Sequence, residues 1–568
     1  LYSNNKQRKG RMGVGSKLSL PLERAYKWER AKADELYLTQ PMGEGQVQEY
    51  TWNRAVGEAR RMASYLKSLE LPPKSNIAIL SKNCAHWIMT DLAIWMAGHV
   101  TVPLYPTLNS ETVRYILEHS DSKILFVGKL DEWDEMKPGV PADLPCISYP
   151  LSPENDFPSW DEIVTDHAPL KEETQRDAQE LATIVYTSGS TGKPKGVMVS
   201  FEAMAIAAKG VAEALEMKDT ERMLSYLPLA HVFERYAVEQ ASLHIGFHVY
   251  FAEALDTFLQ DLQRARPTVF ISVPRLWAKF QLGVFQKMPP EKLKFLLSIP
   301  ILSSIVKKKV LKNLGLDHCH FAVSGSAPLS GEIINWYRGL GLELMEGYGM
   351  SENFAYSHIS LPGRSRVGYV GEPLPGVEQR ISEKGEIEIR SPASMMGYYK
   401  DDEKTRESFT EDGFLLTGDK GEIDEMGRLK ITGRIKEIFK TSKGKYVAPA
   451  PIENMLMASD ALEVVCVAGA ECPQPYAMAV LSEQFQGQHK DPSLREKLEP
   501  AIEALIQKVN SRVDHHEALQ FIVIVSDTWG IENDFLTPTM KIKRDVIEKY
   551  YENRVTGWQK QKKPIVWD

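Results

Sequence analysis

Ten consecutive residues, TSGSTGKPKG at 187–196, carry the groups that bind an anion. The stretch contains three glycines, four hydroxyl side chains and two lysines, and it has no large apolar side chain. Glycines allow backbone N–H groups to point inward, while hydroxyl and ammonium groups add further donors and positive charge. The composition therefore predicts a loop that holds a chain of phosphates.

This loop differs from the nucleotide-binding P-loop, G-x-x-x-x-G-K-[ST]. Pro194 stands five residues after Gly189, where that pattern places its second glycine. The flanking segments LATIVY (181–186) and GVMVS (196–200) both have the apolar character of buried strands, and a helix is expected only after Ser200, a good N-cap residue. We therefore expect the loop to join two strands. A flexible linker is a poor alternative, because linkers seldom lie between apolar strands.

A second segment, GYGMSE at 347–352, combines an aromatic ring with a carboxylate. Glycines on both sides of Tyr348 would let a flat ring approach it, which suits stacking on a base. Glu352 is a suitable ligand for Mg²⁺. The alternative is a core tyrosine beside a surface glutamate.

Two further segments each offer one charged group. LLTGDKGE (415–422) places Asp419 in what we expect to be a Gly-flanked turn, where its carboxylate could accept hydrogen bonds from two neighbouring ribose hydroxyls or serve as a plain turn residue. LTPTMKIKRD (536–545) presents Lys541 from an irregular, proline-containing stretch before a helix. A simple surface lysine is the alternative there.

The elements that must position these groups alternate between strand and helix. Such alternation predicts parallel sheets covered by helices, here in two related α/β layers. In such sheets ligands bind beyond the carboxyl ends of the strands, so the loop at 187–196, SGSAP (324–328) and GYGMSE are expected to share one cleft. The expected strands of the two series are 76–80, 100–105 and 123–128, then 222–228, 249–252, 268–274, 320–326 and 343–349.

After residue 366 short strands and turns at 385–391, 413–419 and 427–433 indicate a small antiparallel β unit, and beyond Gly433 an α+β pattern follows. The expected fold class is therefore α/β. It comprises a large N-terminal domain of two α/β layered subdomains plus a small β-barrel-like subdomain, and a small α+β C-terminal domain joined by a hinge. We expect the domains at 1–433 and 437–568, with the hinge at 434–436.

Composition restricts the class of protein. The chain has 568 residues, 43% of them hydrophobic and 25% charged, as in ordinary globular proteins that split into several packed units. A net charge of −8 argues against a general nucleic-acid binder. Five scattered cysteines without a C-x-x-C pair indicate a reducing compartment. No apolar run is long enough to span a bilayer and no apolar region follows the basic N-terminal arm, so a cytoplasmic protein is expected.

One segment leaves two readings open. In KFLLSIPILSSIVKKKV (294–310) apolar residues precede the three lysines at 307–309. A core helix with a solvated lysine end would give this pattern. So would a basic amphipathic segment that lies on an anionic membrane surface, which would make the protein peripheral on the inner face of a membrane.

Taken together, the four segments resemble, in order and context, those of the adenylate-forming superfamily, which includes acyl- and aryl-CoA synthetases, luciferases and peptide-synthetase adenylation domains. The resemblance covers roughly residues 40 to 550, and LPLAHVFERY (227–236) is similar to the long-chain fatty acyl-CoA synthetase branch. It implies an enzyme of fatty acid metabolism, a ligase that activates a long-chain fatty acid with ATP as acyl-AMP and transfers the acyl group to CoA. An aryl acid or an acceptor other than CoA is the alternative, followed by a non-catalytic lipid-binding protein.

The resemblance also implies roles for single residues. The loop would wrap the β- and γ-phosphates of ATP, Thr187 and Glu352 would hold Mg²⁺, and Lys541 would bridge the fatty carboxylate and the α-phosphate. Lys436 matches the hinge, and His231 matches the acyl pocket. ATP or AMP would contact Thr187, Ser188, Gly189, Ser190, Thr191, Gly192, Lys193, Gly325, Ser326, Ala327, Gly347, Tyr348, Gly349, Met350, Ser351, Asp419 and Arg434, and CoA would meet the turn of Gly444, Lys445 and Tyr446.

The chain departs from the family pattern at three positions. Ser351 replaces the usual threonine but keeps the hydroxyl. Met540 stands before Lys541 where glycine is common, which predicts a less pliant loop. Arg235 lies four residues after His231, where some long-chain enzymes have a tryptophan that gates the acyl tunnel.

Overall fold

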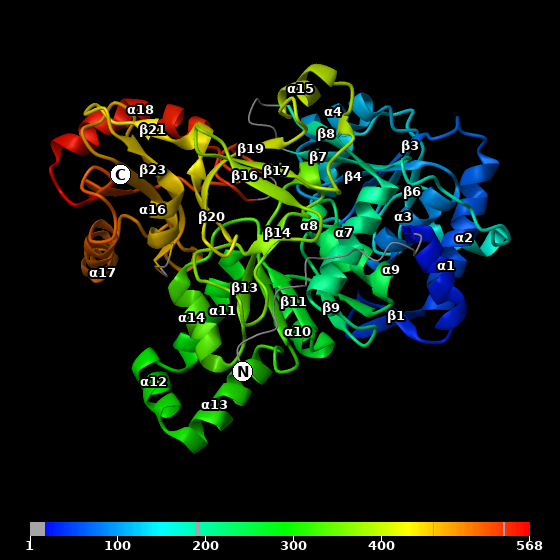
Figure 1. Ribbon diagram of the computed structural model, residues 1–568, viewed down its shortest axis with the longest axis horizontal. Helices are drawn as coiled ribbons and strands as arrows, with labels where there is room; N and C mark the ends of the chain where they lie inside the picture. Colours follow the sequence, from blue (N-terminus) through cyan, green and yellow to red (C-terminus); the bar gives the residue numbers. More distant parts are fainter. Residues whose placement is uncertain (1–17, 188–192, 458, 460, 538–539) are drawn as a thin grey trace, which may run out of the picture.

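The computed structural model confirms the expected fold class, with mixed sheets in a large N-terminal α/β domain and a smaller C-terminal domain (Figure 1). The division at 434–436 stays a prediction; these residues form the end of one strand and the start of a 3₁₀ turn, Ile435–Glu437. The structure describes residues 18–187, 193–457, 459, 461–537 and 540–568.

The first sheet of the N-terminal domain has seven strands in the order β18-β8-β7-β4-β3-β5-β6. β3 to β7 run parallel, and β8 returns antiparallel to β7, as expected for a loop that joins two strands. The predicted N-cap is confirmed, because Ser200 accepts a hydrogen bond from the backbone N–H of Ala203 at 3.1 Å. The strands are β3 (Asn76–Leu80), β4 (Val100–Leu104), β5 (Ile124–Val127), β6 (Cys146–Ser148), β7 (Leu181–Thr187), β8 (Lys195–Ser200) and β18 (Gly397–Tyr398).

The second layer contains two sheets, β2-β1-β10-β9 and β11-β12-β13-β14-β15. They adjoin at β9 and β11, where the N–H of Thr268 donates to the carbonyl of Arg222 at 2.9 Å. The five strands expected in this layer all form. The strands are β1 (Leu36–Gly43), β2 (Gln46–Thr51), β9 (Arg222–Ser225), β10 (His248–Phe251), β11 (Val269–Ser272), β12 (Phe321–Ser324), β13 (Leu344–Tyr348), β14 (His358–Ile359) and β15 (Glu372–Pro373).

Helices pack on these sheets and bury their apolar faces. α3 is buried along its whole length, which explains why its sequence is apolar on all sides except at His86, Thr90 and Asp91. The helices of this domain are α1 (Pro21–Ala31), α2 (Trp52–Ser68), α3 (Ala85–Met96), α4 (Ser110–Ser120), α5 (Trp133–Met136), α6 (Trp160–Asp166), α7 (Phe201–Ala214), α8 (Val232–Glu234), a π-helical turn (Arg235–Gln240), α9 (Ala241–Ile245), α10 (Phe258–Ala265), α11 (Pro274–Lys287), α12 (Pro290–Ser298), α13 (Pro300–Asn313), α14 (Gly331–Leu340) and α15 (Asp402–Glu407).

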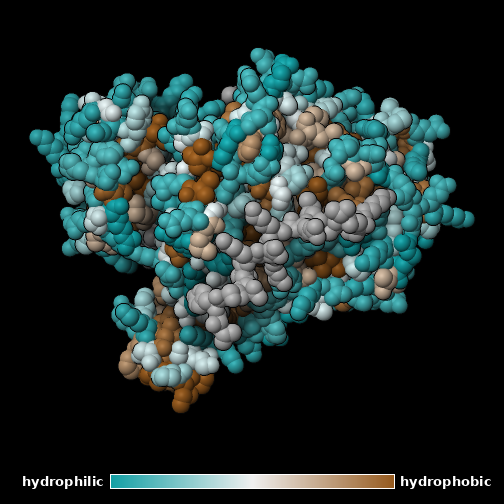
Figure 2. Space-filling view, viewed as in Figure 1, coloured by the Kyte–Doolittle hydropathy of each residue, from teal (hydrophilic) through white to brown (hydrophobic). Residues whose placement is uncertain are grey.

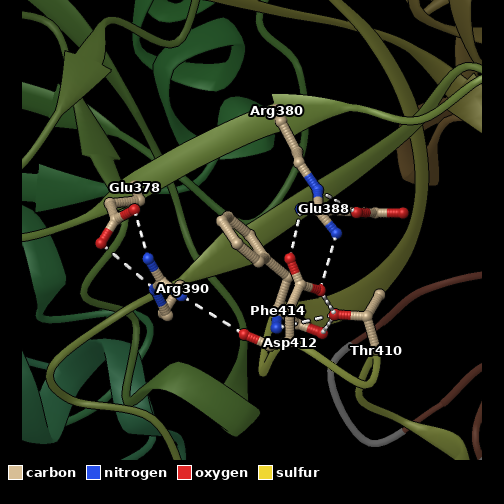
Figure 3. A network of polar contacts seen from close by, with 7 residues as sticks. All are labelled: Glu378, Arg380, Glu388, Arg390, Thr410, Asp412 and Phe414. Atoms are coloured by element: carbon tan, nitrogen blue, oxygen red, sulfur yellow. Dashed lines mark hydrogen bonds and ion pairs between the residues drawn. The ribbon is translucent and has the colours of Figure 1, made fainter.

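The expected antiparallel unit is a four-stranded sheet, β16-β17-β19-β20, with β16 (Glu378–Ile381), β17 (Glu386–Arg390), β19 (Leu415–Ile423) and β20 (Leu429–Arg434). A network of polar contacts fixes the turn before β19 (Figure 3). The guanidinium of Arg380 donates to Asp412 at 2.6 and 3.0 Å and lies over the ring of Phe414 at 4.0 Å. Arg390 lies over the same ring at 4.7 Å. The network thus anchors the strand that carries Asp419.

The C-terminal domain has one mixed sheet, β23-β24-β25-β26. α16 and α17 share one apolar core with the sheet, and α18 contributes to a second core. The last strand, β26, was not expected from the sequence. The elements are β21 (Phe439–Lys440), β22 (Tyr446–Val447), α16 (Pro449–Leu456), β23 (Leu462–Ala468), β24 (Tyr476–Leu481), α17 (Pro492–Asn510), β25 (Ile522–Ile524), α18 (Arg544–Lys560) and β26 (Ile565–Trp567).

The segment 294–310 forms the end of α12 and most of α13. Its side chains Phe295, Ile301, Leu302 and Ile305 are exposed, so the prediction of a core helix is wrong for these residues. Across the described part of the chain, no helix is both long and apolar enough to cross a bilayer.

Candidate active site

Three predicted nucleotide-binding residues from three strands meet at one carboxylate. Tyr348, at the end of β13, donates its hydroxyl to Asp419 Oδ2 at 2.6 Å, and Arg434 Nε donates to Asp419 Oδ1 at 2.9 Å. Asp419 and Arg434 are cross-strand partners in β19 and β20, so the prediction that Asp419 lies in a turn is wrong. Burial raises the pKa of Tyr348 well above its usual range, which keeps the phenol protonated as a donor.

This cluster leaves acceptor capacity for a ligand. A carboxylate has about four lone-pair sites, and two are used by Tyr348 and Arg434. The aromatic ring and the remaining acceptor sites of Asp419 therefore lie side by side at the carboxyl end of β13. A base with an attached pair of hydroxyls has complementary chemistry.

The loop after β12 lies next to this cluster along the sheet, since β12 and β13 are parallel neighbours. A side chain at Gly325 would approach the ring of Phe233 to 3.0 Å, so the backbone passes close to this ring. Ser326 has a φ of +68°, a left-handed conformation that is unfavourable by roughly 1–2 kcal/mol for a non-glycine residue. Ser326 and Ala327 are exposed and can contact a ligand.

The carboxylate of Glu352 is held by a tyrosine that the sequence did not mark as a site residue. Tyr398 in β18 donates its hydroxyl to Glu352 Oε1 at 2.7 Å, and the carbonyl of Glu352 accepts from the N–H of Met395 at 2.7 Å. Within the described residues, Glu352 Oε2 has no hydrogen-bond partner. The backbone before it is tightly folded, because a side chain at Gly349 would approach the carbonyl of Ala355 to 2.5 Å.

These residues fit a magnesium site. Mg²⁺ prefers oxygen ligands and keeps several waters or phosphate oxygens in its shell. Glu352 offers a free carboxylate oxygen, and Thr187, at the end of β7, offers a hydroxyl. Ser188, Gly189, Ser190, Thr191 and Gly192 of the predicted phosphate loop lie outside the described residues.

Lys541 comes from the C-terminal domain and reaches the charged groups of the N-terminal domain. The residue is exposed, and the protein around its ammonium group together with the charge of Arg434 lowers its pKa, while Asp419 and Glu352 act in the opposite direction. Its backbone N–H donates to Thr537 Oγ1 at 3.1 Å. Met540 before it has a φ of +61°, which agrees with the family's preference for glycine at this position.

His231 lies within electrostatic reach of the same ammonium group. Burial and the charge of Lys541 lower the pKa of His231 to about 4, so the imidazole is neutral near pH 7. Its Nδ1 accepts a hydrogen bond from the N–H of Phe233 at 3.1 Å, which assigns the proton to Nε2. His231 Nε2 is therefore available as a hydrogen-bond donor.

Arg235 is fully buried and cannot serve as a movable gate. Its guanidinium pairs with Asp91 of α3, with Glu239 at 3.1 Å, and with the hydroxyl of Thr183 at 2.7 Å. It also lies over the ring of Trp87 at 5.2 Å. Removing the guanidinium would leave the carboxyl groups of Asp91 and Glu239 in the core without their cation.

Two residues near the site were missed. Lys195 in β8 has its Nζ 5.6 Å from the ring centre of Tyr398, and burial together with Lys404 lowers its pKa while Glu352 raises it. Lys195 is the second lysine of the Gly-rich segment, so its proximity to a phosphate could have been inferred. Nothing local in the sequence marks Tyr398 as the partner of Glu352.

The remaining predicted residues differ in how near they lie to this cluster. Among the described residues, the hydrogen bonds of the turn 444–446 stay within the C-terminal domain, and Tyr446 is exposed beside Lys440. Lys193 is exposed, 5.5 Å from the ring centre of Tyr115. The charge of Lys436 contributes to lowering the pKa of Lys195, which places the expected hinge close to the site.

Comparison with known proteins gives consistent results over nearly the whole chain. Residues 26–399 match the AMP-binding enzyme family and residues 436–562 match the AMP-binding enzyme C-terminal domain. The long-chain-fatty-acid–CoA ligase FadD15 of Mycobacterium bovis is 30% identical over 93% of this chain and 95% of its own length. Peroxisomal long chain acyl-CoA synthetase 6 of Arabidopsis thaliana is 29% identical over 91% and 83%.

Solved structures agree in fold. The anthranilate CoA ligase AuaEII, crystallised with anthranoyl-AMP, superposes with a TM-score of 0.76 at 21% identity, over 95% of this chain and 98% of that one. On the extent of the family match and the similarity to FadD15, this chain belongs to the AMP-binding enzyme family of the adenylate-forming superfamily.

Proposed function

We propose that this protein is an ATP-dependent ligase that converts a long-chain fatty acid into its CoA thioester through an acyl-AMP intermediate. One observation carries the proposal. Lys541, from the C-terminal domain, has its ammonium group within the electrostatic reach of Asp419, Glu352 and His231 of the N-terminal domain. A cation between a nucleotide site and a neutral histidine is suited to bring a carboxylate to a phosphate.

The nucleotide would bind at the carboxyl ends of the sheet strands. Adenine would lie against Tyr348 and the backbone at 325–327, and the ribose hydroxyls would donate to Asp419. Arg434 and the hydroxyl of Tyr348 hold that carboxylate in place. The Gly-rich segment at 187–196 would contact the β- and γ-phosphates. Mg²⁺, held by Thr187 and Glu352, would neutralise charge on the phosphates.

In the first half-reaction an oxygen of the fatty carboxylate attacks the α-phosphorus. The bond between that phosphorus and the oxygen leading to the β-phosphate breaks, and pyrophosphate leaves with the electron pair. Two anions must meet, so the barrier is largely electrostatic and positional. Lys541 would bridge the carboxylate and the α-phosphate, and His231 Nε2 would donate to the carboxylate. No side chain needs to act as a nucleophile.

In the second half-reaction the sulfur of CoA attacks the carbonyl carbon of the adenylate. The bond from that carbon to the AMP oxygen breaks, and the thiol loses its proton. The turn at 444–446 belongs to the C-terminal domain, so we propose that this domain rotates near Lys436, withdraws Lys541 and presents the turn to the adenylate. Two relatives support a preference for long chains, because one is named a long-chain-fatty-acid–CoA ligase and the other a long chain acyl-CoA synthetase.

ATP–pyrophosphate exchange measured with fatty acids of graded length and with an aryl acid tests the proposal. Mass spectrometry after addition of CoA identifies the thioester. Exchange is expected to be greatest with long-chain acids. Preference for the aryl acid, or exchange without thioester, would favour the alternatives, and fatty acid binding without exchange would indicate a non-catalytic lipid-binding protein.

A variant pair tests the role of Lys541. Lys541→Met should lower exchange by about 100-fold or more, the magnitude typical for loss of one group that stabilises charge in a transition state. It should largely retain thioester formation from supplied acyl-AMP. Lys543→Met is the matched control. Lys543 lies two residues after Lys541 in the chain, but its ammonium group pairs with Asp534. Equal loss of both half-reactions in Lys541→Met would contradict the role.

A further inference from the structure

α12 and α13 form a helical arm that protrudes from the N-terminal domain (Figure 1). Four large apolar side chains of this arm are exposed: Phe295 by 65%, Ile301 by 79%, Leu302 by 40% and Ile305 by 58%. Figure 2 shows a hydrophobic surface at the tip of the arm. Folding the chain leaves these side chains in water, so they are available for a partner.

The clustering separates this surface from ordinary exposed residues. Single exposed apolar side chains are normal in soluble proteins, and Leu255, 86% exposed in a loop, is an example. Contiguous exposed apolar patches instead mark a binding surface. The four side chains of the arm lie within eleven residues, 295–305, on the end of one helix and the start of the next.

The arm also concentrates positive charge. Residues 287–312 contain seven lysines and one glutamate, a formal charge of +6 in a chain whose net charge is −8. Six of the seven lysines are exposed and Lys307 is partly exposed. The partner must therefore accept an apolar tip and supply negative charge around it.

The positions of these groups match the profile of a lipid surface. Ile301, Ile305, Lys308 and Lys312 follow each other at three- and four-residue spacing on one face of α13. When the arm enters tip first, with the axis of α13 along the bilayer normal, a rise of about 1.5 Å per residue places Lys308 about 4.5 Å and Lys312 about 10 Å shallower than Ile305. Interfacial segments bury their apolar side chains about 5–10 Å deep, so lysines at these offsets would reach the headgroup layer.

We propose that the tip of the α12–α13 arm docks on the surface of an anionic lipid bilayer. Phe295, Ile301, Leu302 and Ile305 enter the boundary of the acyl chains, and the surrounding lysines contact the lipid phosphates. A second copy of this chain is a poorer partner, because matching arms would bring +6 against +6. The inference does not depend on the proposed function, since vesicle binding requires neither ATP nor an acid.

Co-sedimentation with sucrose-loaded vesicles tests the docking. The full chain is mixed with vesicles of phosphatidylcholine alone or with added phosphatidylglycerol. Wild type is expected to bind the anionic vesicles at least about tenfold more tightly, with a preference that falls as salt rises. Ile301→Asp combined with Ile305→Asp should weaken binding to the anionic vesicles by at least tenfold. Leu255→Asp is the matched control and should bind like wild type.

Neutralising lysines separates the electrostatic contribution to vesicle binding from the apolar one. Exchange of Lys307, Lys308 and Lys309 for serine halves the formal charge of the arm from +6 to +3, so it should reduce the preference for anionic vesicles while the weak binding to neutral vesicles remains. Circular dichroism verifies that each variant is folded. The proposal is overturned if wild type does not bind anionic vesicles, or if the double aspartate variant binds them as well as the control. It is also overturned if sedimentation without lipid shows a dimer that the double variant abolishes, since the surface would then join two copies.

Discussion

Glu332 at the start of α14 pairs with Lys508 of α17 at 2.8 Å, and so connects the two domains. Arg512 contacts the same carboxylate at 3.1 Å, and Arg275 pairs with Glu463 at a second point between the domains. These ion pairs form in the same arrangement in which Lys541 lies near Asp419. They therefore stabilise the pose that the proposed adenylation requires.

Breaking this contact should shift the balance between the half-reactions. Exposed ion pairs contribute about 0.2–1 kcal/mol each, so Lys508→Gln with Arg512→Gln should slow ATP–pyrophosphate exchange by only about two- to thirtyfold. Thioester formation from supplied acyl-AMP should be unchanged or faster. Lys497→Gln, on the same helix, serves as control. Equal slowing of both half-reactions would show that the contact does not select a pose.

Asp419→Asn should impair nucleotide binding. The variant loses a charge that Arg434 pairs with and the acceptor of the Tyr348 hydroxyl. Hydrogen bonds to charged groups contribute about 1.5–3 kcal/mol, so the KM for ATP should rise about tenfold or more. Tyr348→Phe, which removes one of the two contacts and keeps the ring, should have a smaller effect. Unchanged ATP affinity in Asp419→Asn would refute the assignment.

The environment of Glu346 predicts that the stability of the protein depends on pH. Its side chain is buried in β13 and accepts from the N–H of Leu329 at 3.2 Å, and burial raises its pKa to about 7. Between about pH 4.5 and 7 the unfolded state ionises while the folded state keeps the proton, so the free energy of unfolding falls as pH rises. The total penalty is about 3 kcal/mol above pH 7.

Glu346→Gln removes this titration. Compared with wild type, the variant should gain stability progressively from pH 5 to pH 8, measured by urea unfolding monitored by fluorescence. Glu343→Gln is a suitable control on the same side of the domain, since Glu343 accepts from Gly363 and Ser365 near the surface. If the difference in the free energy of unfolding between wild type and Glu346→Gln does not change with pH, a raised pKa of Glu346 is excluded.

Arg235→Met should destabilise the N-terminal domain by about 3–5 kcal/mol, because Asp91 and Glu239 would lose their buried cation. Adding Asp91→Asn and Glu239→Gln to this variant should recover part of the loss. The check is the unfolding midpoint of the single and triple variants. If the single variant is as stable as wild type, the buried ion pairs do not hold this region together.

Much of the architecture could be predicted because periodicity and capping are local signals. The buried strand at 181–187 and the N-cap at Ser200 lie where the sequence indicates them. The neighbourhood of Lys541 could be expected only through the family resemblance, since its charged neighbours lie more than a hundred residues away along the chain.

The remaining features depend on tertiary contacts. Tyr398 and Glu352 are 46 residues apart; Tyr398 lies in β18, and Glu352 lies in the 3₁₀ turn Ser351–Asn353. Asp419 has the Gly-flanked sequence of a turn, yet cross-strand pairing with Arg434 extends it into β19. Arg235 looks like a surface charge until its buried partners on α3 and β7 are known. At each of these positions a contact between residues far apart in the chain determines the structure, and local sequence preference does not.

The backbone at Met540 bears on how Lys541 would be delivered in the proposed reaction. An unfolded chain rarely places a methionine at a φ of +61°, so the bridge between Leu536 and Ile542 must impose this conformation during folding. The conformational entropy of the Met540 backbone is then lost once, when the domain folds. In the proposed reaction each cycle would therefore begin with a preorganised lysine, and only the rigid-body position of the domain would have to change.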